Sequence, residues 1–363
     1  MPTSHRLPPH RTALAVLAAA LLLAVSACAK DASTRSGTPS GPTTTAEAVT
    51  ALAKVPPGTV LHVGDQLDYL KTILAASGQD RDLPYQVEYA NFIGGPPMLQ
   101  AFQGGAIDTG FVASTPLIFA QAAGQQIVAV AGWAPEHGLG GLISADPSIR
   151  SWKDLEGKRV AYQRGTSAEA AVLTALDREG LSPSDITTVD VPITQIASTL
   201  KSGSADAGLS TEPLISGFLA DTPGGHLVAK ADDITDRGAF LIASREALDD
   251  RARSAAVADY VTRLVKAYAW LAAHEEVLAD SIFAKQYHLT PQRALELADS
   301  TGRTTFLSLP GDVATPQQEL ADRFHAAGQI PSKIDTSQEW DTRFNALVQR
   351  TAEQAADRQQ AGS

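Results

Sequence analysis

The stretch QGGAIDTGFVASTPLI, residues 103–118, decides the fold, because KSGSADAGLSTEPLI at residues 201–215 repeats it about a hundred residues later. Any two strand–helix units share some residue types. Matched G-x-x-D-x-G followed by T-P or T-E-P nevertheless favours a true repeat, which predicts two similar lobes. With one residue of slippage, the aligned pairs are Gly105 with Gly203, Asp108 with Asp206, Gly110 with Gly208, and Pro116 with Pro213.

Short apolar stretches alternate with helical ones on both sides of this repeat. VLHVG near residue 60, YQVEYAN near 85 and QIVAVAG near 126 are typical of strands, and amphipathic stretches separate them. This order predicts an α/β fold. The chain is expected to cross between the lobes twice, so we assign residues 58–145 plus 239–363 to lobe I and 146–238 to lobe II.

Residues 1–27 have the pattern of an export signal. Basic residues precede an unbroken run of 13 apolar residues from Ala13 to Val25. That run is shorter than the roughly 20 residues that a membrane-spanning helix needs. We therefore expect the rest of the chain to be exported.

Cys28 is the only cysteine, so the chain has no intramolecular disulfide. Val25-Ser26-Ala27-Cys28 resembles a bacterial lipobox, in which the thiol is diacylated and becomes the first residue. The alternative is an apolar cysteine that merely ends a signal peptide. Residues 29–46 contain almost no large apolar side chain. We predict a lipid anchor and flexible linker over 28–57, with the protein held at the cell membrane on its extracytoplasmic side.

Composition narrows the classes of function. Among 363 residues, 29 are lysine or arginine and 40 are aspartate or glutamate, which gives a net charge of -11. An acidic chain with no basic run does not concentrate a polyanion, so we expect no nucleic-acid partner. A small anion remains possible, because a few local dipoles are enough to hold one.

Four segments place a helix start directly after a strand or a turn. Helix starts leave unpaired N–H groups and a partial positive charge, which attract anions. In an open α/β sheet such starts meet at the carboxyl ends of the strands, where closure of two lobes would surround one small molecule. Ordinary helix capping is the default explanation for any single one of them, and the four together are more specific. The four segments are Gly94-Gly95-Pro96-Pro97, Ser114-Thr115-Pro116, Thr166-Ser167-Ala168-Glu169 and Thr211-Glu212-Pro213.

The segment NFIGGPPMLQAFQGGAIDTGFVASTPLIFAQAAGQQIVAVAG, followed by WKDLEGKRVAY and RGTS, resembles the ABC-transporter substrate-binding proteins for aliphatic sulfonates, taurine and nitrate. The resemblance covers about residues 59–245. It implies a two-lobed periplasmic-binding-protein type II fold with a ligand cleft between the lobes. It also implies that hydroxyls and helix-start amides hold the anionic head of the ligand. By position, the site carries over to Gln66, Ser114, Thr115, Gly165, Thr166 and Ser167.

The second lobe departs from the family pattern at one point. The family often has an aromatic residue before the acidic residue and proline, whereas Thr211 precedes Glu212 here. Trp133 is a candidate to supply the missing aromatic contact, and sealing of the lobe is its alternative role. Glu212, a negative charge near the predicted site, leaves open a receptor for a neutral or cationic solute.

The sequence carries no strong sign of catalysis. P-loop, G-x-S-x-G, H-E-x-x-H and C-x-x-C motifs are absent, and no two histidines have the spacing of helix-borne metal ligands. We expect no enzyme, no cofactor and no metal. The hypothesis is a lipid-anchored receptor that binds a small oxyanion, such as an organic sulfonate, and delivers it to an ABC permease. An anchored enzyme that uses the same cleft is the first alternative.

Overall fold

The computed structural model of the protein describes residues 54–231 and 238–362. The predicted signal peptide over 1–27, Cys28 and most of the predicted linker lie outside these residues. The described residues all fall within one compact unit, Thr43–Ser363. Within the described ranges, no helix combines the length and the apolar character that a membrane crossing requires.

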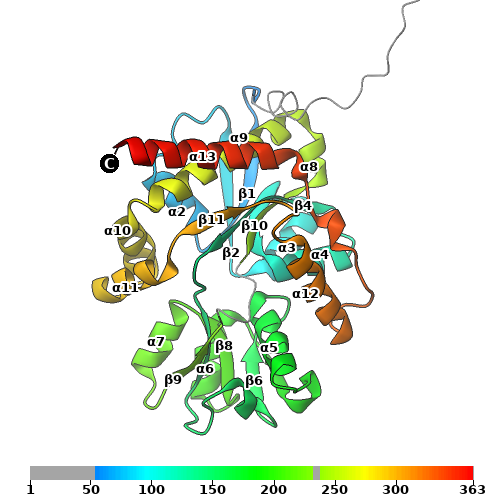
Figure 1. The fold of residues 1–363 in the computed structure, drawn as a ribbon, viewed down its shortest axis with the longest axis vertical. Helices are drawn as coiled ribbons and strands as arrows, with labels where there is room; N and C mark the ends of the chain where they lie inside the picture. The colour runs from blue at the N-terminus through cyan, green and yellow to red at the C-terminus, as the bar shows by residue number, and fades with distance from the viewer. Residues whose placement is uncertain (1–53, 232–237, 363) are drawn as a thin grey trace, which may run out of the picture. The chain divides into compact units, whose positions relative to one another are not determined.

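Two mixed sheets follow the same strand plan (Figure 1). The first has the order β2-β1-β3-β10-β4-β11, and the second has the order β7-β6-β8-β5-β9. In each sheet the first three strands are parallel, and the next strand is antiparallel to them. The first sheet contains β1 (Val60–Gln66), β2 (Gln86–Phe92), β3 (Thr109–Ala113), β4 (Ile127–Pro135), β10 (Ala239–Ser244) and β11 (Thr304–Leu307). The second contains β5 (Gly140–Ser144), β6 (Arg159–Tyr162), β7 (Thr187–Asp190), β8 (Ala207–Thr211) and β9 (His226–Lys230).

Helices cover the sheets and, with strand β11, form the C-terminal third of the chain (Figure 1). Those before residue 230 are α2 (Tyr69–Ala76), α3 (Gly95–Gln103), α4 (Ser114–Ala122), α5 (Ser167–Arg178), α6 (Ile196–Lys201) and α7 (Leu214–Asp221). Those after it are α8 (Arg245–Asp249), α9 (Arg251–Leu271), α10 (Glu275–Val277), the π-helix η4 (Leu278–Gln286), α11 (Pro291–Thr301), α12 (Ala314–Ala326) and α13 (Asn345–Gly362). Short 3-10 turns are η1 (Trp152–Leu155), η2 (Pro183–Asp185), η3 (Ile193–Gln195), η5 (Thr336–Glu339) and η6 (Thr342–Phe344).

The repeated aspartates do the same structural work in both sheets. Asp108 accepts a hydrogen bond from the backbone N–H of His62 at 2.9 Å, and Asp206 accepts one from that of Arg159 at 2.8 Å. Each aspartate also donates its own N–H back to the carbonyl of that same partner, at 2.8 Å in both lobes. The repeated aspartate, which directly precedes β3 or β8, therefore joins that strand to its parallel neighbour, β1 or β6.

The repeated glycines are explained by close packing. A Cβ at Gly110 would lie 2.8 Å from Met98 Sδ and 2.9 Å from the Gly64 carbonyl oxygen. A Cβ at Gly208 would lie 2.6 Å from Ile196 Cγ2. In each lobe the glycine thus lets one helix, α3 or α6, approach the sheet.

The first crossing between the sheets comes earlier than predicted. We placed 140–145 in lobe I, but β5 pairs with β8 and β9 in the second sheet. The reason is that β5 pairs antiparallel with β8 in the second sheet, as β10 pairs antiparallel with β3 in the first. The return crossing, between β9 and β10, includes residues outside the described ranges.

An apolar cluster joins helices of the two sheets. Ile118 in α4, Leu173 in α5 and Phe324 in α12 belong to one buried group. Arg323 adds a 2.6 Å hydrogen bond from its Nη1 to Thr174 Oγ1. Helix α12 therefore contacts both sheets' helices, whereas the sequence indicated packing on the first lobe alone.

Candidate functional site

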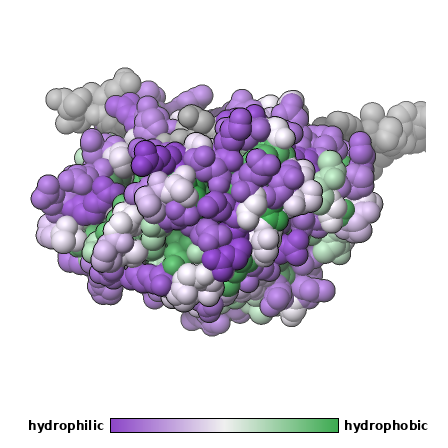
Figure 2. Space-filling model, turned by 90° about the horizontal axis from the view of Figure 1, so that it is seen from below, coloured by the Kyte–Doolittle hydropathy of each residue, from purple (hydrophilic) through white to green (hydrophobic). Residues whose placement is uncertain are grey.

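A cavity of about 440 Å³ is lined by residues from elements of both sheets. Its volume falls within the range of small-molecule sites, roughly 300–1,000 Å³. Among the predicted site residues, Gln66, Trp133, Thr166, Ser167 and Glu212 line it. The face of the molecule in Figure 2 is mostly hydrophilic, and its hydrophobic side chains show in recesses between polar ones. This cavity is the candidate ligand site.

The start of α5 supplies unpaired hydrogen-bond donors to the cavity. Thr166 is the N-cap residue, and its Oγ1 accepts from the backbone N–H of Ala168 at 3.3 Å. Ser167 is the first helical residue, and within the described residues neither its N–H nor its hydroxyl has a hydrogen-bond partner. An N–H at a helix start beside the positive end of the helix dipole suits an anion.

The start of α3 lies on the opposite side of the same region. Gly94 and Gly95 line the cavity, and a Cβ at Gly94 would lie 3.5 Å from the side-chain amide of Gln163. Gly94 has a φ of 85°, which favours glycine. A Cβ at Gly95 would overlap Pro116, only 2.3 Å from its Cγ. The glycine pair therefore lets the first-sheet helices approach each other and the second sheet closely.

Three predicted residues lie outside the cavity wall. Ser114 and Thr115 are 2% and 1% exposed, because the start of α4 is buried beneath α12 and η5. The Ser114 carbonyl accepts a hydrogen bond from Gln317 Nε2 at 3.2 Å. The residue that caps α4 is Ala113, so no hydroxyl caps this helix, although the segment Ser114-Thr115-Pro116 suggests one.

Gly165 is the third of these residues, and its N–H is already used. It donates to Glu169 Oε2 at 2.7 Å, so this amide is not available to a ligand. Glu169 is buried, which raises its pKa, while the hydrogen bond from Gly165 lowers it. The T-x-x-E spacing of residues 166–169 is typical of a capping box, and that prediction is wrong. Thr166 Oγ1 accepts from Ala168 rather than from Glu169, and Glu169 accepts from Gly165 rather than from Thr166.

Glu212 lines the cavity but is paired within the protein. Its Oε1 accepts from Arg293 Nη2 at 2.8 Å, and its Oε2 accepts from the Ser216 hydroxyl at 2.6 Å. Arg293 Nε also donates to the Ser216 hydroxyl at 2.9 Å. Arg293 of α11 therefore neutralises the negative charge of Glu212, which was the reason to consider a cationic solute.

Aromatic side chains form a part of the wall of which the sequence analysis named only Trp133. Trp133 is buried, and its ring lies 6.2 Å from that of Phe111 and 5.4 Å from that of Tyr268. Tyr69 and Tyr287 line the same cavity. Gln66 is beside them, with its Nε2 donating to the Phe111 carbonyl at 2.7 Å. No local signal marks Tyr268, which lies in the long helix α9, because its role depends on packing against strands over a hundred residues earlier.

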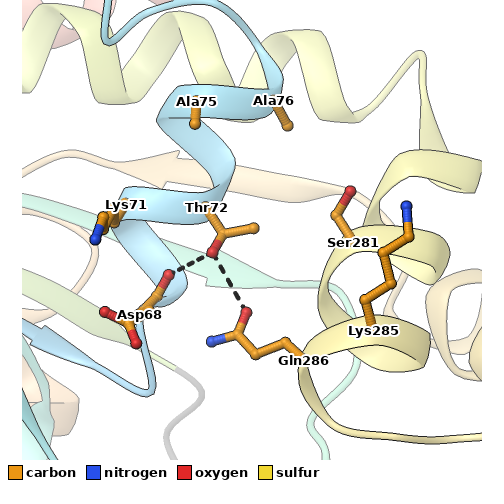
Figure 3. A pocket seen from close by; sticks show the side chains of 8 residues that line it. All are labelled: Asp68, Lys71, Thr72, Ala75, Ala76, Ser281, Lys285 and Gln286. Carbon is orange, nitrogen blue, oxygen red and sulfur yellow. Dashed lines mark hydrogen bonds between the residues drawn. The ribbon is translucent and has the colours of Figure 1, made fainter.

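A second cavity, of about 570 Å³, is a surface groove between α2 and η4 (Figure 3). Thr72 donates to the Asp68 carbonyl at 2.7 Å and to Gln286 Oε1 at 3.4 Å across it. Lys71 and Lys285 also line this groove. It contains none of the predicted site residues, so it does not compete as the ligand site.

The cavity wall offers little for catalysis. The described lining residues include no histidine, cysteine, lysine or arginine. Within the described residues, no cluster of three or more histidine, cysteine, aspartate or glutamate side chains has the arrangement of a metal site. What the described part of the wall does offer is neutral hydrogen-bond donors, aromatic faces and one paired carboxylate.

The family model described as "NMT1/THI5 like" matches residues 93–275. The chain belongs to the NMT1/THI5-like family. The matched part includes β3, α4, β4, the whole second sheet and β10, and thus most of the cavity wall.

Relatives with solved structures have the same fold. An Escherichia coli (strain K12) protein named for binding aliphatic sulfonates is 29% identical over 283 residues, 77% of this chain and 87% of the relative. The crystal structure of the periplasmic aliphatic sulphonate binding protein SsuA from Escherichia coli has a TM-score of 0.66 and 28% identity, with 78% and 92% coverage. The alkanesulfonate-binding protein SsuA from Xanthomonas axonopodis pv. citri, bound to MOPS, has a TM-score of 0.71 and 25% identity, with 79% and 99% coverage. The predicted family and periplasmic-binding-protein fold are confirmed.

Proposed function

We propose that this family member is the solute-binding protein of an ABC importer and binds a small oxyanion such as an aliphatic sulfonate. The observation that carries the proposal is the start of α5, where the free N–H and hydroxyl of Ser167 border a cavity lined from both sheets. The sulfonate-binding relatives support the same class of ligand. We propose further that binding is not followed by chemistry, and that an ABC permease receives the solute.

A panel of ligands with opposite charges and matched lengths tests the proposal. Short alkanesulfonates, sulfate esters and nitrate are compared with amines of equal length in thermal melts of the full chain. A hundredfold excess over the dissociation constant adds about 2.7 kcal/mol to the free energy of unfolding. We expect stabilisation by sulfonates and none by amines, since Arg293 already pairs with Glu212. Stabilisation by amines alone would replace the anion with a cation as the ligand.

The enzyme alternative is tested on the same samples. Protein and a stabilising sulfonate are incubated together, and the molecular mass of the recovered solute is measured by mass spectrometry. Recovery of the unchanged compound is expected, because the described cavity wall holds no histidine or cysteine. A new product that requires the protein would establish an enzyme.

Membrane attachment through Cys28 is proposed from the sequence, since this residue lies outside the described ranges. Replacement of Cys28 with serine is expected to move the protein from the detergent phase to the aqueous phase. Solute binding should persist, because the predicted linker separates the anchor from the cavity. Delivery to a permease predicts that cells lacking this chain lose uptake of the stabilising sulfonate and regain it with the native gene.

A further inference from the structure

The part of the cavity wall that comes from the first sheet and its helices is aromatic. Among the residues that the structure describes, six aromatic side chains line the cavity, and none of these six comes from the second sheet. They belong to α2, β3, β4, α9, the π-helix η4 and the residue that follows it, which are distant in sequence. These side chains, which we call the aromatic cup, are Tyr69, Phe111, Trp133, Tyr268, Phe283 and Tyr287.

Four members of the cup form a closed circuit of ring contacts. The ring centroids are 6.2 Å apart for Tyr69 and Phe111, and 6.2 Å for Phe111 and Trp133. They are 5.4 Å apart for Trp133 and Tyr268, and 6.4 Å for Tyr268 and Tyr69. The planes are tilted by 39° to 46° throughout. Rings at these distances and angles hold one another in place, so the cup is preorganised before a ligand enters.

The tyrosine hydroxyls of the cup do not carry a charge. Burial raises the pKa of Tyr268 well above its ordinary value, and burial likewise raises the pKa values of Tyr69 and Tyr287. The phenols therefore stay neutral, and the cup offers mainly apolar ring surface.

Apart from Gln66, Thr301 and Thr304, the uncharged polar residues of the described cavity wall lie on the second sheet's side. Gln163, Thr166, Ser167, Ser210 and Thr211 line it there. A ligand that fills the cavity thus meets hydrogen-bond donors at one end and ring surface at the other. A short alkanesulfonate would satisfy the donors but leave the partly exposed rings of the cup uncovered. These rings are Tyr69, Phe111 and Tyr287, and the other three members are at most 7% exposed.

We propose that the preferred ligand is an oxyanion with an aromatic tail, an arylsulfonate in the simplest case, whose ring lies in the aromatic cup. This inference rests on the proposed function and specifies its substrate class. An aromatic cup also suits quaternary ammonium groups. The cation is disfavoured here, because the only carboxylate of the described wall is paired with Arg293 and the opposite end presents donors that repel a cation.

Calorimetric titration of the full chain with ethanesulfonate and 2-naphthalenesulfonate tests the inference. We expect naphthalenesulfonate to bind at least about tenfold more tightly, which corresponds to about 1.4 kcal/mol. Equal or weaker binding of naphthalenesulfonate would overturn the inference while the proposed function stands. Absence of binding by either compound and by every other sulfonate would overturn the proposed function itself. Tight binding of (2-naphthylmethyl)trimethylammonium without binding of naphthalenesulfonate would overturn both.

A pair of substitutions at Tyr287 locates the ring contact. Tyr287 is half-buried and follows the last residue of η4. Tyr287→Leu keeps an apolar side chain but removes the ring, and Tyr287→Phe removes only the hydroxyl. We expect the preference for naphthalenesulfonate over ethanesulfonate to fall about fivefold in the leucine variant and to persist in the phenylalanine variant. Thermal melts confirm that both variants fold, and an unchanged preference in the leucine variant would place the tail outside the cup.

Discussion

Arg293 in α11 and Glu212 at the end of β8 form an ion pair, with Nη2 and Oε1 2.8 Å apart. The glutamate side chain is 9% exposed and the arginine side chain is 41% exposed. The pair joins a helix of the C-terminal third to the second sheet at the cavity wall. A carboxylate in this position needs its partner, because a buried charge without one costs more free energy than the ion pair itself contributes to stability.

Removal of Arg293 alone is therefore expected to cost more than removal of both partners. Arg293→Ala should lower the free energy of unfolding by about 1–2 kcal/mol, and the double variant Arg293→Ala/Glu212→Gln should recover part of it. Urea unfolding measures both. Lys285→Ala is the control, since its pair with Asp280 is exposed on both sides and should contribute under about 1 kcal/mol. Strictly additive losses in the double variant would contradict a coupled pair.

Gly208→Ala should destabilise the second sheet. The added methyl group would lie 2.6 Å from Ile196 Cγ2 and 3.2 Å from the Ala161 carbonyl oxygen. A misfit of this kind typically costs about 1–3 kcal/mol. Gly217→Ala in α7 is the matched control, because no atom lies within 4 Å of its Cβ position and alanine favours a helix by up to about 1 kcal/mol. Urea unfolding should therefore show opposite signs for the two variants.

Glu339 predicts a pH dependence of stability. Burial raises its pKa from 4.5 to about 8, although a hydrogen bond from Gln317 lowers it. The folded state thus keeps a proton that the unfolded state loses above pH about 4.5. Its stabilising contribution is present below that pH and is lost as the pH rises to about 8, with a slope of up to about 1.4 kcal/mol per pH unit.

Glu339→Gln removes this titration. The variant should match the native protein near pH 4.5 and exceed it in free energy of unfolding at pH 8. Denaturant unfolding across this interval gives the difference between the two proteins, in which other titrating groups cancel. A difference that does not change with pH would show that Glu339 titrates normally.

Ser167→Pro should weaken anion binding more than it weakens the fold. The first helical position tolerates proline, and Thr166 has the extended backbone that precedes proline readily, with φ of -124° and ψ of 170°. The substitution removes the free N–H and the hydroxyl, so we expect about a tenfold loss of sulfonate affinity or more. Arg251→Pro, at the first position of α9 after an extended Asp250, is the control. Calorimetry and melts of both variants compare binding with stability, and equal affinities would move the anion away from α5.

The residues that the sequence identified well are those whose roles are local. Thr166 and Ser167 begin a helix because a capping hydroxyl and its first-turn partner lie within a few residues. The matched Gly105 and Gly203 both have positive φ, 66° and 68°, as glycine in a turn allows. The repeat predicted two similar lobes, and the sheets have the same strand plan.

The sequence by itself therefore determined the α/β order, the repeat and the positions of the helix starts, because capping and strand–helix periodicity act between near neighbours. Only the tertiary structure decided which starts reach the cavity. Ser114 and Thr115 resemble Thr166 and Ser167 along the chain, yet α12 and η5 cover the first pair. The aromatic cup and the Arg293–Glu212 pair likewise depend on contacts between distant segments. Those contacts are set by how whole helices pack on the sheets, which no local pattern specifies.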